Sequence, residues 1–123
     1  LVKPLGFSLE DRYLKRAGLD YWPHVKLHIH DDLEEVLGPL DLDQVAFYST
    51  HATRNYTEFR PQGDPWFIFG CETSGLPDEL LAAQAERAYK IPITNHVRSL
   101  NLANACAVVL YDAAARNGFD FGV

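Results

Sequence analysis

The chain has 123 residues, of which 47% are hydrophobic and 23% charged, values typical of one globular domain with a buried core. No apolar run approaches the roughly 20 residues that cross a bilayer, and the first residues lack the basic segment and apolar core of a signal peptide. The formal charge of −6 excludes long-range attraction of a polyanion by the whole chain. Any nucleic-acid binding therefore depends on a local basic patch.

The two cysteines, Cys71 and Cys106, do not have the spacing of a disulfide framework. This usage is typical of a reducing compartment, and we expect the protein in the cytoplasm. The sequence begins inside what reads as a strand, from which we expect a truncated product.

The first predicted elements are a helix and a strand. Ser8 followed by Asp11 is typical of a helix N-terminus, and the pattern predicts a helix from about Leu9 to Ala17 that ends at Gly18. Apolar and polar side chains then alternate from His24 to His30, which predicts a half-buried strand.

Two acidic residues introduce the next helix. Asp31 and Asp32 suit the first turn of a short helix over residues 33–37, which Gly38 ends. The compact apolar run from Val45 to Ser49 then predicts a buried parallel strand.

The central part of the chain continues the alternation of strands and helices. Trp66 to Phe69 predicts a second buried strand, and a helix follows over residues 77–84, since Pro77 stands where a first turn tolerates proline. Tyr89 to Ile93 predicts a short strand that either lies at the sheet edge or ends at Pro92. The order of elements indicates an α/β fold with a largely parallel sheet flanked by helices.

The longest predicted helix spans Leu102 to Arg116 and ends at Gly118. One apolar face contains Leu102, Ala105, Cys106, Val109 and Ala113, and a second contains Ala103, Ala107 and Leu110. A helix that is apolar on two faces must be covered on both. In so short a chain we expect a second subunit as the cover, which makes the protein a homodimer.

Three segments occupy the positions where ligands bind in parallel α/β sheets. Residues 69–77 (Phe-Gly-Cys-Glu-Thr-Ser-Gly-Leu-Pro) place two glycines around a polar tetrapeptide, which suits either close approach to a ligand or an ordinary turn. Residues 91–97 begin with Ile-Pro-Ile and continue as a polar loop. Residues 98–104 (Arg-Ser-Leu-Asn-Leu-Ala-Asn) open the last helix, where Ser99 is either a functional residue or a plain N-cap.

In this order the three segments resemble motifs two and three of the SPOUT methyltransferases. Upstream, residues 3–7 (Lys-Pro-Leu-Gly-Phe) and 14–21 (Leu-Lys-Arg-Ala-Gly-Leu-Asp-Tyr) look like the branch that methylates the ribose of the tRNA wobble nucleotide, cytidine or uridine 34. The resemblance covers essentially the entire chain. It implies an S-adenosylmethionine-dependent RNA 2′-O-methyltransferase.

The resemblance also carries expectations about architecture and partners. It implies an α/β fold with a deep trefoil knot near the C-terminus, an exception to the rule of unknotted connections. Residues 1–123 would form one such domain without the family's first strand and helix. S-adenosylmethionine would bind in the knot of a homodimer, and the RNA partner would be the tRNA anticodon region, with no membrane and no metal.

The site residues follow from positions in the motifs. The cofactor would contact Tyr48, Gly70, Ile91, Ser99 and Leu100. Ser99, Asn101 and Glu72 are the catalytic candidates. Glu72 and Asn101 match polar motif positions near the methyl donor, and Ser99 and Asn101 could orient the ribose hydroxyl or the amino-acid part of the cofactor. The donor methyl is already activated on a sulfonium, so the protein must align the ribose 2′-hydroxyl with it and disperse a proton.

The sequence departs from the family pattern at positions where related enzymes carry positive charge. Related enzymes carry an N-terminal Asn-x-Gly-x-x-Arg segment that supplies an arginine to the active site. This sequence does not contain it, and we therefore expect little or no activity from a 123-residue chain. His51 and Ser74 stand where relatives often carry lysine and arginine, which weakens the expected RNA contacts.

A basic patch has two interpretations. It would consist of Arg12, Lys15, Arg16, Lys26, Arg54 and Arg60. The first three are spaced so that they share one helix face. The patch is either an RNA contact or a solvated surface.

Other classes of function also remain open. His24, His28 and His30 are either metal ligands or surface histidines. Cys71 and His96 are either the nucleophile and base of a hydrolase or unrelated, with Cys71 a small buried residue. The protein could also be a dimeric module that binds S-adenosylmethionine or RNA without catalysis, or a SPOUT methyltransferase that acts on another RNA.

Overall fold

A computed structural model describes residues 1–5, 21–61 and 63–120. The helix predicted over residues 9–17, with three of the basic residues, lies outside these ranges. The chain divides into two compact units, Leu1–Leu40 and Asp41–Val123, and each is described by itself. No helix within the described ranges is long and apolar enough to cross a membrane.

The first unit contains the short helix α2 (Leu33–Leu37), which confirms the predicted one. Its start is fixed by Asp32, whose Oδ1 accepts a hydrogen bond from the backbone N–H of Glu35 at 3.0 Å and so satisfies a free helix donor. A 3-10 helix, Trp22–His24, precedes it. Val36 is the buried residue of α2.

The strand predicted from His24 to His30 does not form. Its apolar side chains are exposed, with 42% of Val25, 37% of Leu27 and 44% of Ile29 accessible. The backbone pairs only near its end, where Val2 and His30 make an isolated parallel bridge. The prediction was wrong because a strand needs a partner along its length, and the described residues supply one only at this point.

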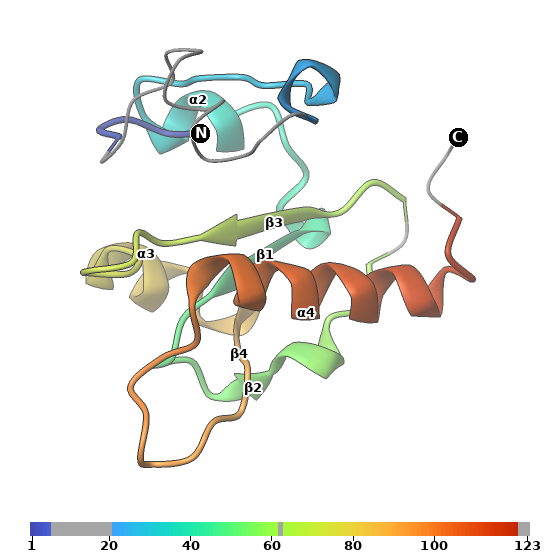
Figure 1. Ribbon diagram of the computed structural model, residues 1–123. Coiled ribbons are helices and arrows are strands. Elements are labelled where there is room, and N and C mark those ends of the chain that lie inside the picture. Colours follow the sequence, from blue (N-terminus) through green and yellow to red (C-terminus); the bar gives the residue numbers. More distant parts are fainter. Residues whose placement is uncertain (6–20, 62, 121–123) are drawn as a thin grey trace. The chain divides into compact units, whose positions relative to one another are not determined.

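The second unit contains the sheet (Figure 1). Its strands are β1 (Val45–Tyr48), β2 (Arg54–Asn55), β3 (Trp66–Phe69) and β4 (Ala88–Lys90), in the order β2-β4-β1-β3. All three pairings are parallel. The predicted α/β fold with a parallel sheet is therefore confirmed, and the knot stays a prediction.

Three of the predicted strands have different outcomes. β3, predicted to be buried, lies at an edge of the sheet with Trp66 exposed and its other residues half-buried, so that prediction was wrong. Every residue of β1 is buried, as expected for a central strand with a partner on each side. β4 also lies inside the sheet, between β2 and β1, so its expected edge position was wrong. The other alternative holds, since β4 ends at Lys90, before the proline that could not donate a ladder hydrogen bond.

Two helices and three 3-10 turns complete the second unit. They are α3 (Asp78–Ala83), α4 (Leu102–Arg116) and the turns Leu42–Gln44, Tyr56–Glu58 and Ala85–Arg87. Both helices fall where the sequence predicts them. Beyond the C-cap Asn117, Gly118 has φ +63°, and the N–H groups of Gly118 and Phe119 donate to the carbonyls of Ala115 and Ala114. These two bonds satisfy carbonyls that the end of α4 leaves free.

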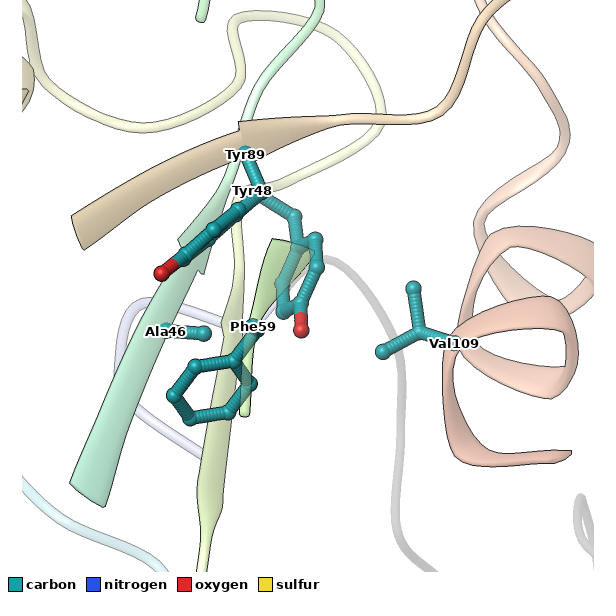
Figure 2. Packing of buried hydrophobic residues seen from close by; sticks show 5 residues of the cluster. All are labelled: Ala46, Tyr48, Phe59, Tyr89 and Val109. Carbon is teal, nitrogen blue, oxygen red and sulfur yellow. The ribbon is translucent and has the colours of Figure 1, made fainter. Parts of the chain in front are cut away.

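The core of the second unit is aromatic (Figure 2). One cluster of buried residues consists of Ala46, Tyr48, Phe59, Tyr89 and Val109, and other residues of this unit, such as Val45 and Phe47, are buried as well. The rings of Tyr48 and Phe69 stack with centroids 4.8 Å apart, an arrangement that adds to the burial of apolar surface. Val109 is the one described residue of α4 that is fully buried, and its side chain faces these rings in Figure 2.

One face of α4 is covered by the sheet and the other is exposed. The residues predicted for the first face are buried or half-buried, whereas Ala103, Ala107 and Leu110 of the second face are exposed. Tyr111 beside them is 64% exposed. Among the described residues, α4 is therefore covered on a single side.

Candidate functional site

The site lies where three parallel strands end at the same edge of the sheet. The segments that follow β1, β3 and β4 surround an open cavity of about 650 Å³, within the size range of small-molecule sites. Every residue that the motifs predict for the site lines this cavity: Tyr48, Gly70, Glu72, Ile91, Ser99, Leu100 and Asn101. The three sequence segments thus converge on one cavity, whereas the role of each residue stays a prediction.

The wall after β3 depends on its two glycines. A Cβ built on Gly70 would lie 2.2 Å from the carbonyl carbon of Gly75 and 2.3 Å from the nitrogen of Leu76, so no other residue fits at position 70. Gly75 has φ +68°, which disfavours other residues, and its N–H donates to the carbonyl of Cys71 at 3.0 Å. The predicted turn is a closed loop fixed by its own backbone.

Cys71 lies in this loop with its thiol exposed, so the alternative that it is a small buried residue was wrong. Its Sγ lies 2.9 Å from the hydroxyl oxygen of Ser74 and 3.7 Å from that of Thr73. Hydrogen bonds from Ser74, and then from Thr73, lower the pKa of Cys71 to about 6, because they favour the thiolate. No hydrogen bond joins His96 to Cys71 in the described ranges, and His96 does not line the cavity.

The floor of the cavity is formed by the ends of the strands. Tyr48 and Tyr89 line it beside Phe69 and Ile91. Burial, with smaller contributions from Tyr89 and Asp112, raises the pKa of Tyr48. Tyr48 is therefore a neutral phenol at ordinary pH and contributes surface rather than a base.

The wall before α4 is open and carries unused polar groups. Asn101 is the N-cap of α4, and its Oδ1 accepts hydrogen bonds from the N–H groups of Ala103 at 2.9 Å and Asn104 at 3.3 Å. The interpretation of Ser99 as the N-cap is thus wrong. In the described part of the chain, the Ser99 hydroxyl and the backbone groups of Leu100 make no hydrogen bond. They are free for a ligand.

One residue of this wall received no role from the sequence. Arg98 lines the cavity with an exposed side chain. It stands directly before Ser99, and that position in the motif was the feature that could have identified it. The same cavity is lined by His51 and Ser74, the two residues that stand where relatives often carry lysine and arginine.

The other charged candidates lie elsewhere. Lys26 belongs to the first unit. Arg54 and Arg60 line a smaller cleft of about 340 Å³ with Arg87, and Arg54 is held by the carboxylate of Glu58 at 3.7 Å. No group of three histidine, cysteine or carboxylate side chains in the described ranges could hold a metal ion.

The groups that line the cavity suit a ligand that consists of a nucleoside and an amino acid. Ile91, Ile93 and Leu100 offer apolar surface for a flat base. Free hydroxyl, backbone and carboxylate groups at Ser99, Leu100 and Glu72 offer partners for polar groups. S-adenosylmethionine, which the motifs imply, fits this combination.

Comparison with known proteins identifies the family. The SpoU rRNA Methylase family matches residues 1–111. A protein of Listeria innocua is 43% identical over 122 residues, which cover 97% of this chain and 72% of that protein. The tRNA (cytidine(34)-2′-O)-methyltransferase of Methylovorus glucosotrophus is 39% identical over 120 residues, which cover 97% of this chain and 78% of that protein.

Solved structures agree. A structure concerned with 2-OH methylation of C/U34 on tRNA superposes with a TM-score of 0.82 and 41% identity, over 95% of this chain and 77% of the other. An AdoMet-bound rRNA methyltransferase from Sinorhizobium meliloti matches more partially, with a TM-score of 0.51 and 31% identity over 59% of this chain and 28% of the other. The fold of this chain thus belongs to a known architecture.

Proposed function

Because the chain belongs to the SpoU rRNA Methylase family, we propose that it transfers a methyl group from S-adenosylmethionine to the ribose 2′-hydroxyl of nucleotide 34, cytidine or uridine, in tRNA. Family membership confirms the resemblance seen in the motifs. The tRNA specificity rests on the name of the Methylovorus relative and on the similarity to the structure concerned with C/U34. The methyl donor rests on the family and on the AdoMet-bound relative.

The observation that carries the proposal is the convergence of the three motif segments on one cavity. The cofactor supplies an activated methyl group when bound. Ile91 and Leu100 would hold its base, while Tyr48 forms the floor. The closed loop at Gly70 would limit where the cofactor can lie, and the free polar groups at Ser99 and Leu100 would be available to hold it.

The polar side chains divide the remaining work. Glu72 is the one carboxylate among the lining residues, so we assign it to accept a hydrogen bond from the ribose. Ser99 has a free hydroxyl that can orient either ligand. Asn101 uses its oxygen to cap α4, which leaves its Nδ2 to donate. Such alignment of reactants contributes to catalysis by lowering the entropic part of the barrier.

Two measurements test the function. Calorimetry should detect binding of S-adenosylmethionine and of its demethylated product by the chain. The chain, joined to a relative's N-terminal Asn-x-Gly-x-x-Arg segment, should then methylate a tRNA transcript, and mass spectrometry should locate one 2′-O-methyl group at nucleotide 34. A transcript with 2′-deoxyribose at nucleotide 34 is the matched control and should accept none.

The outcomes separate the competing interpretations. Cofactor binding with no methyl transfer to any RNA would indicate the non-catalytic module. Transfer to ribosomal RNA, with none to tRNA, would indicate a methyltransferase for another substrate. Failure to bind the cofactor would overturn the proposal.

We also propose a homodimer through the exposed face of α4. Ala107, Leu110 and Tyr111 supply apolar surface there, and burial of such surface is the main drive for association. Light scattering should give twice the chain mass, and Leu110→Glu should give the monomer. A monomeric wild-type protein at micromolar concentration would contradict this.

A further inference from the structure

We propose that Arg98 binds a backbone phosphate of the RNA substrate and so holds the ribose against the cavity. The inference rests on the proposed function and extends it to a substrate-binding residue. It starts from the charge of the chain. At a formal −6, the whole protein repels RNA, and the approach of a phosphate to the cavity must be favoured by a cation at the cavity itself.

Arg98 is the one arginine or lysine among the residues that line the cavity. His51 also lines it, and Glu72 contributes a carboxylate. A permanent positive charge beside the methyl-transfer site therefore comes from Arg98 among the described residues. Its guanidinium can donate two parallel hydrogen bonds to a phosphodiester, a geometry that a lysine does not reproduce.

The side chain of Arg98 is also free to take up this role. Three other arginines of the second unit are engaged: Arg54 with Glu58, Arg87 with Asp43, and Arg116 with Asp112. Arg98 makes no ion pair or side-chain hydrogen bond with any described residue. An exposed and unpaired guanidinium beside a cavity gains more from a phosphate than one that must first leave a carboxylate.

The place of Arg98 in the chain links RNA binding to the reaction. It follows a turn in which the N–H of Val97 donates to the carbonyl of Thr94 at 3.3 Å, and it precedes Ser99, Leu100 and Asn101, all of which line the cavity. A phosphate held by Arg98 thus lies within a few residues of the groups assigned to the ribose and the cofactor.

Three variants of the protein, each joined to a relative's N-terminal Asn-x-Gly-x-x-Arg segment, test the inference: Arg98→Ala, Arg98→Lys and the control Lys90→Ala. Lys90 is a suitable control because it carries one positive charge, has no side-chain partner in the described ranges and lines neither cavity. The measurements are S-adenosylmethionine affinity, kcat and KM for an unmodified tRNA transcript, and the salt dependence of tRNA binding.

Arg98→Ala should leave cofactor affinity unchanged and weaken tRNA binding about 10- to 100-fold, the range for a charge-assisted hydrogen bond. The slope of log affinity against log salt should become shallower by about 0.7, the value for one contact to a single strand. Arg98→Lys should keep the salt slope but recover only part of the affinity. Lys90→Ala should have little effect on either.

The failures are distinguishable. If the wild-type protein methylates tRNA and Arg98→Ala binds tRNA as the wild type does, the inference alone is overturned. If Lys90→Ala weakens binding as much as Arg98→Ala, the effect comes from the net charge and the inference is again overturned. If the wild-type protein methylates no tRNA, the proposed function itself has failed.

Discussion

The two walls of the cavity are built in different ways. The wall after β3 is closed on itself, with a backbone bond between Gly75 and Cys71, contact between thiol and hydroxyl groups, and no space for a side chain at Gly70. The wall before α4 has one hydrogen bond in a turn, between Val97 and Thr94, and the N-cap at Asn101. Ser99 and Leu100 make no hydrogen bond there with any described residue. One wall fixes the shape of the cavity, and the other supplies the groups that a ligand can use.

The largest effect should come from the closed wall. Gly70→Ala places a methyl group 2.2 Å from backbone, so the loop must rearrange, and we expect unfolding free energy to fall by about 1–3 kcal/mol or more. Cofactor binding should be lost. Gly75→Ala is the control, because its Cβ meets nothing within 4 Å and its positive φ costs about 1–2 kcal/mol. Denaturant unfolding and calorimetry measure both, and equal cofactor affinity for Gly70→Ala and the wild type would contradict the closed-wall description.

The cap of α4 should have the next largest effect. Asn101→Ala removes the acceptor for two N–H groups, so stability should fall by about 1 kcal/mol. Asn101→Asp keeps an acceptor but loses the Nδ2 donor. Unfolding free energy near wild type together with reduced methyl transfer in Asn101→Asp would separate the capping role from the ligand role. Full activity in Asn101→Asp would remove Asn101 from the catalytic candidates.

Substitution of Ser99 should change the activity of the protein but not its stability. Its hydroxyl makes no hydrogen bond in the described ranges, so Ser99→Ala should change unfolding free energy by less than about 0.5 kcal/mol, while kcat/KM falls at least about tenfold. Ser49→Ala is a matched control in the same cavity, because the Ser49 Oγ accepts from the N–H of His51 at 3.1 Å. A Ser99→Ala protein with unchanged kinetics would show that the free hydroxyl has no role.

We expect the smallest effect on stability from changes at the thiol of Cys71, in the wall after β3. With its pKa lowered to about 6, Cys71 becomes a thiolate as pH rises through that value, and alkylation by iodoacetamide should accelerate between about pH 5 and 7 and then level off. Ser74→Ala should move this rise toward the ordinary cysteine range. Cys106 is an internal control, because burial raises its pKa and it should react slowly. Cys71→Ala should bind the cofactor almost normally, and loss of all function would revive a nucleophilic role.

The sequence correctly predicted those elements whose burial leaves a clear apolar pattern. The apolar run of β1 and the periodicity of α4 gave their positions, since each reflects burial in the sheet or against it. β2 was missed, because Arg54 and Asn55 carry no apolar pattern and pair only with the end of β4. The segment from His24 to His30 has the right alternation but lacks a partner.

The candidate site, too, was predicted from the sequence only in part. Motif order predicted which segments meet, since parallel strands end at one edge of the sheet. It did not distinguish Ser99 from Asn101 as the N-cap, because both residue types cap helices and the choice depends on backbone angles, here φ −52° and ψ 137° at Asn101. Nor did it show which arginine lacks a carboxylate, a property that depends on contacts distant in the sequence.

The cap at Asn101 has a consequence for observing the protein in solution. One side chain both starts α4 and lines the cavity, so a ligand that contacts it also changes the environment of the amides of Ala103 and Asn104. Deuterium uptake at these two positions should slow when the cavity fills, while the far end of the helix keeps its rate. The first turn of α4 is thus a built-in reporter of occupancy that needs no label.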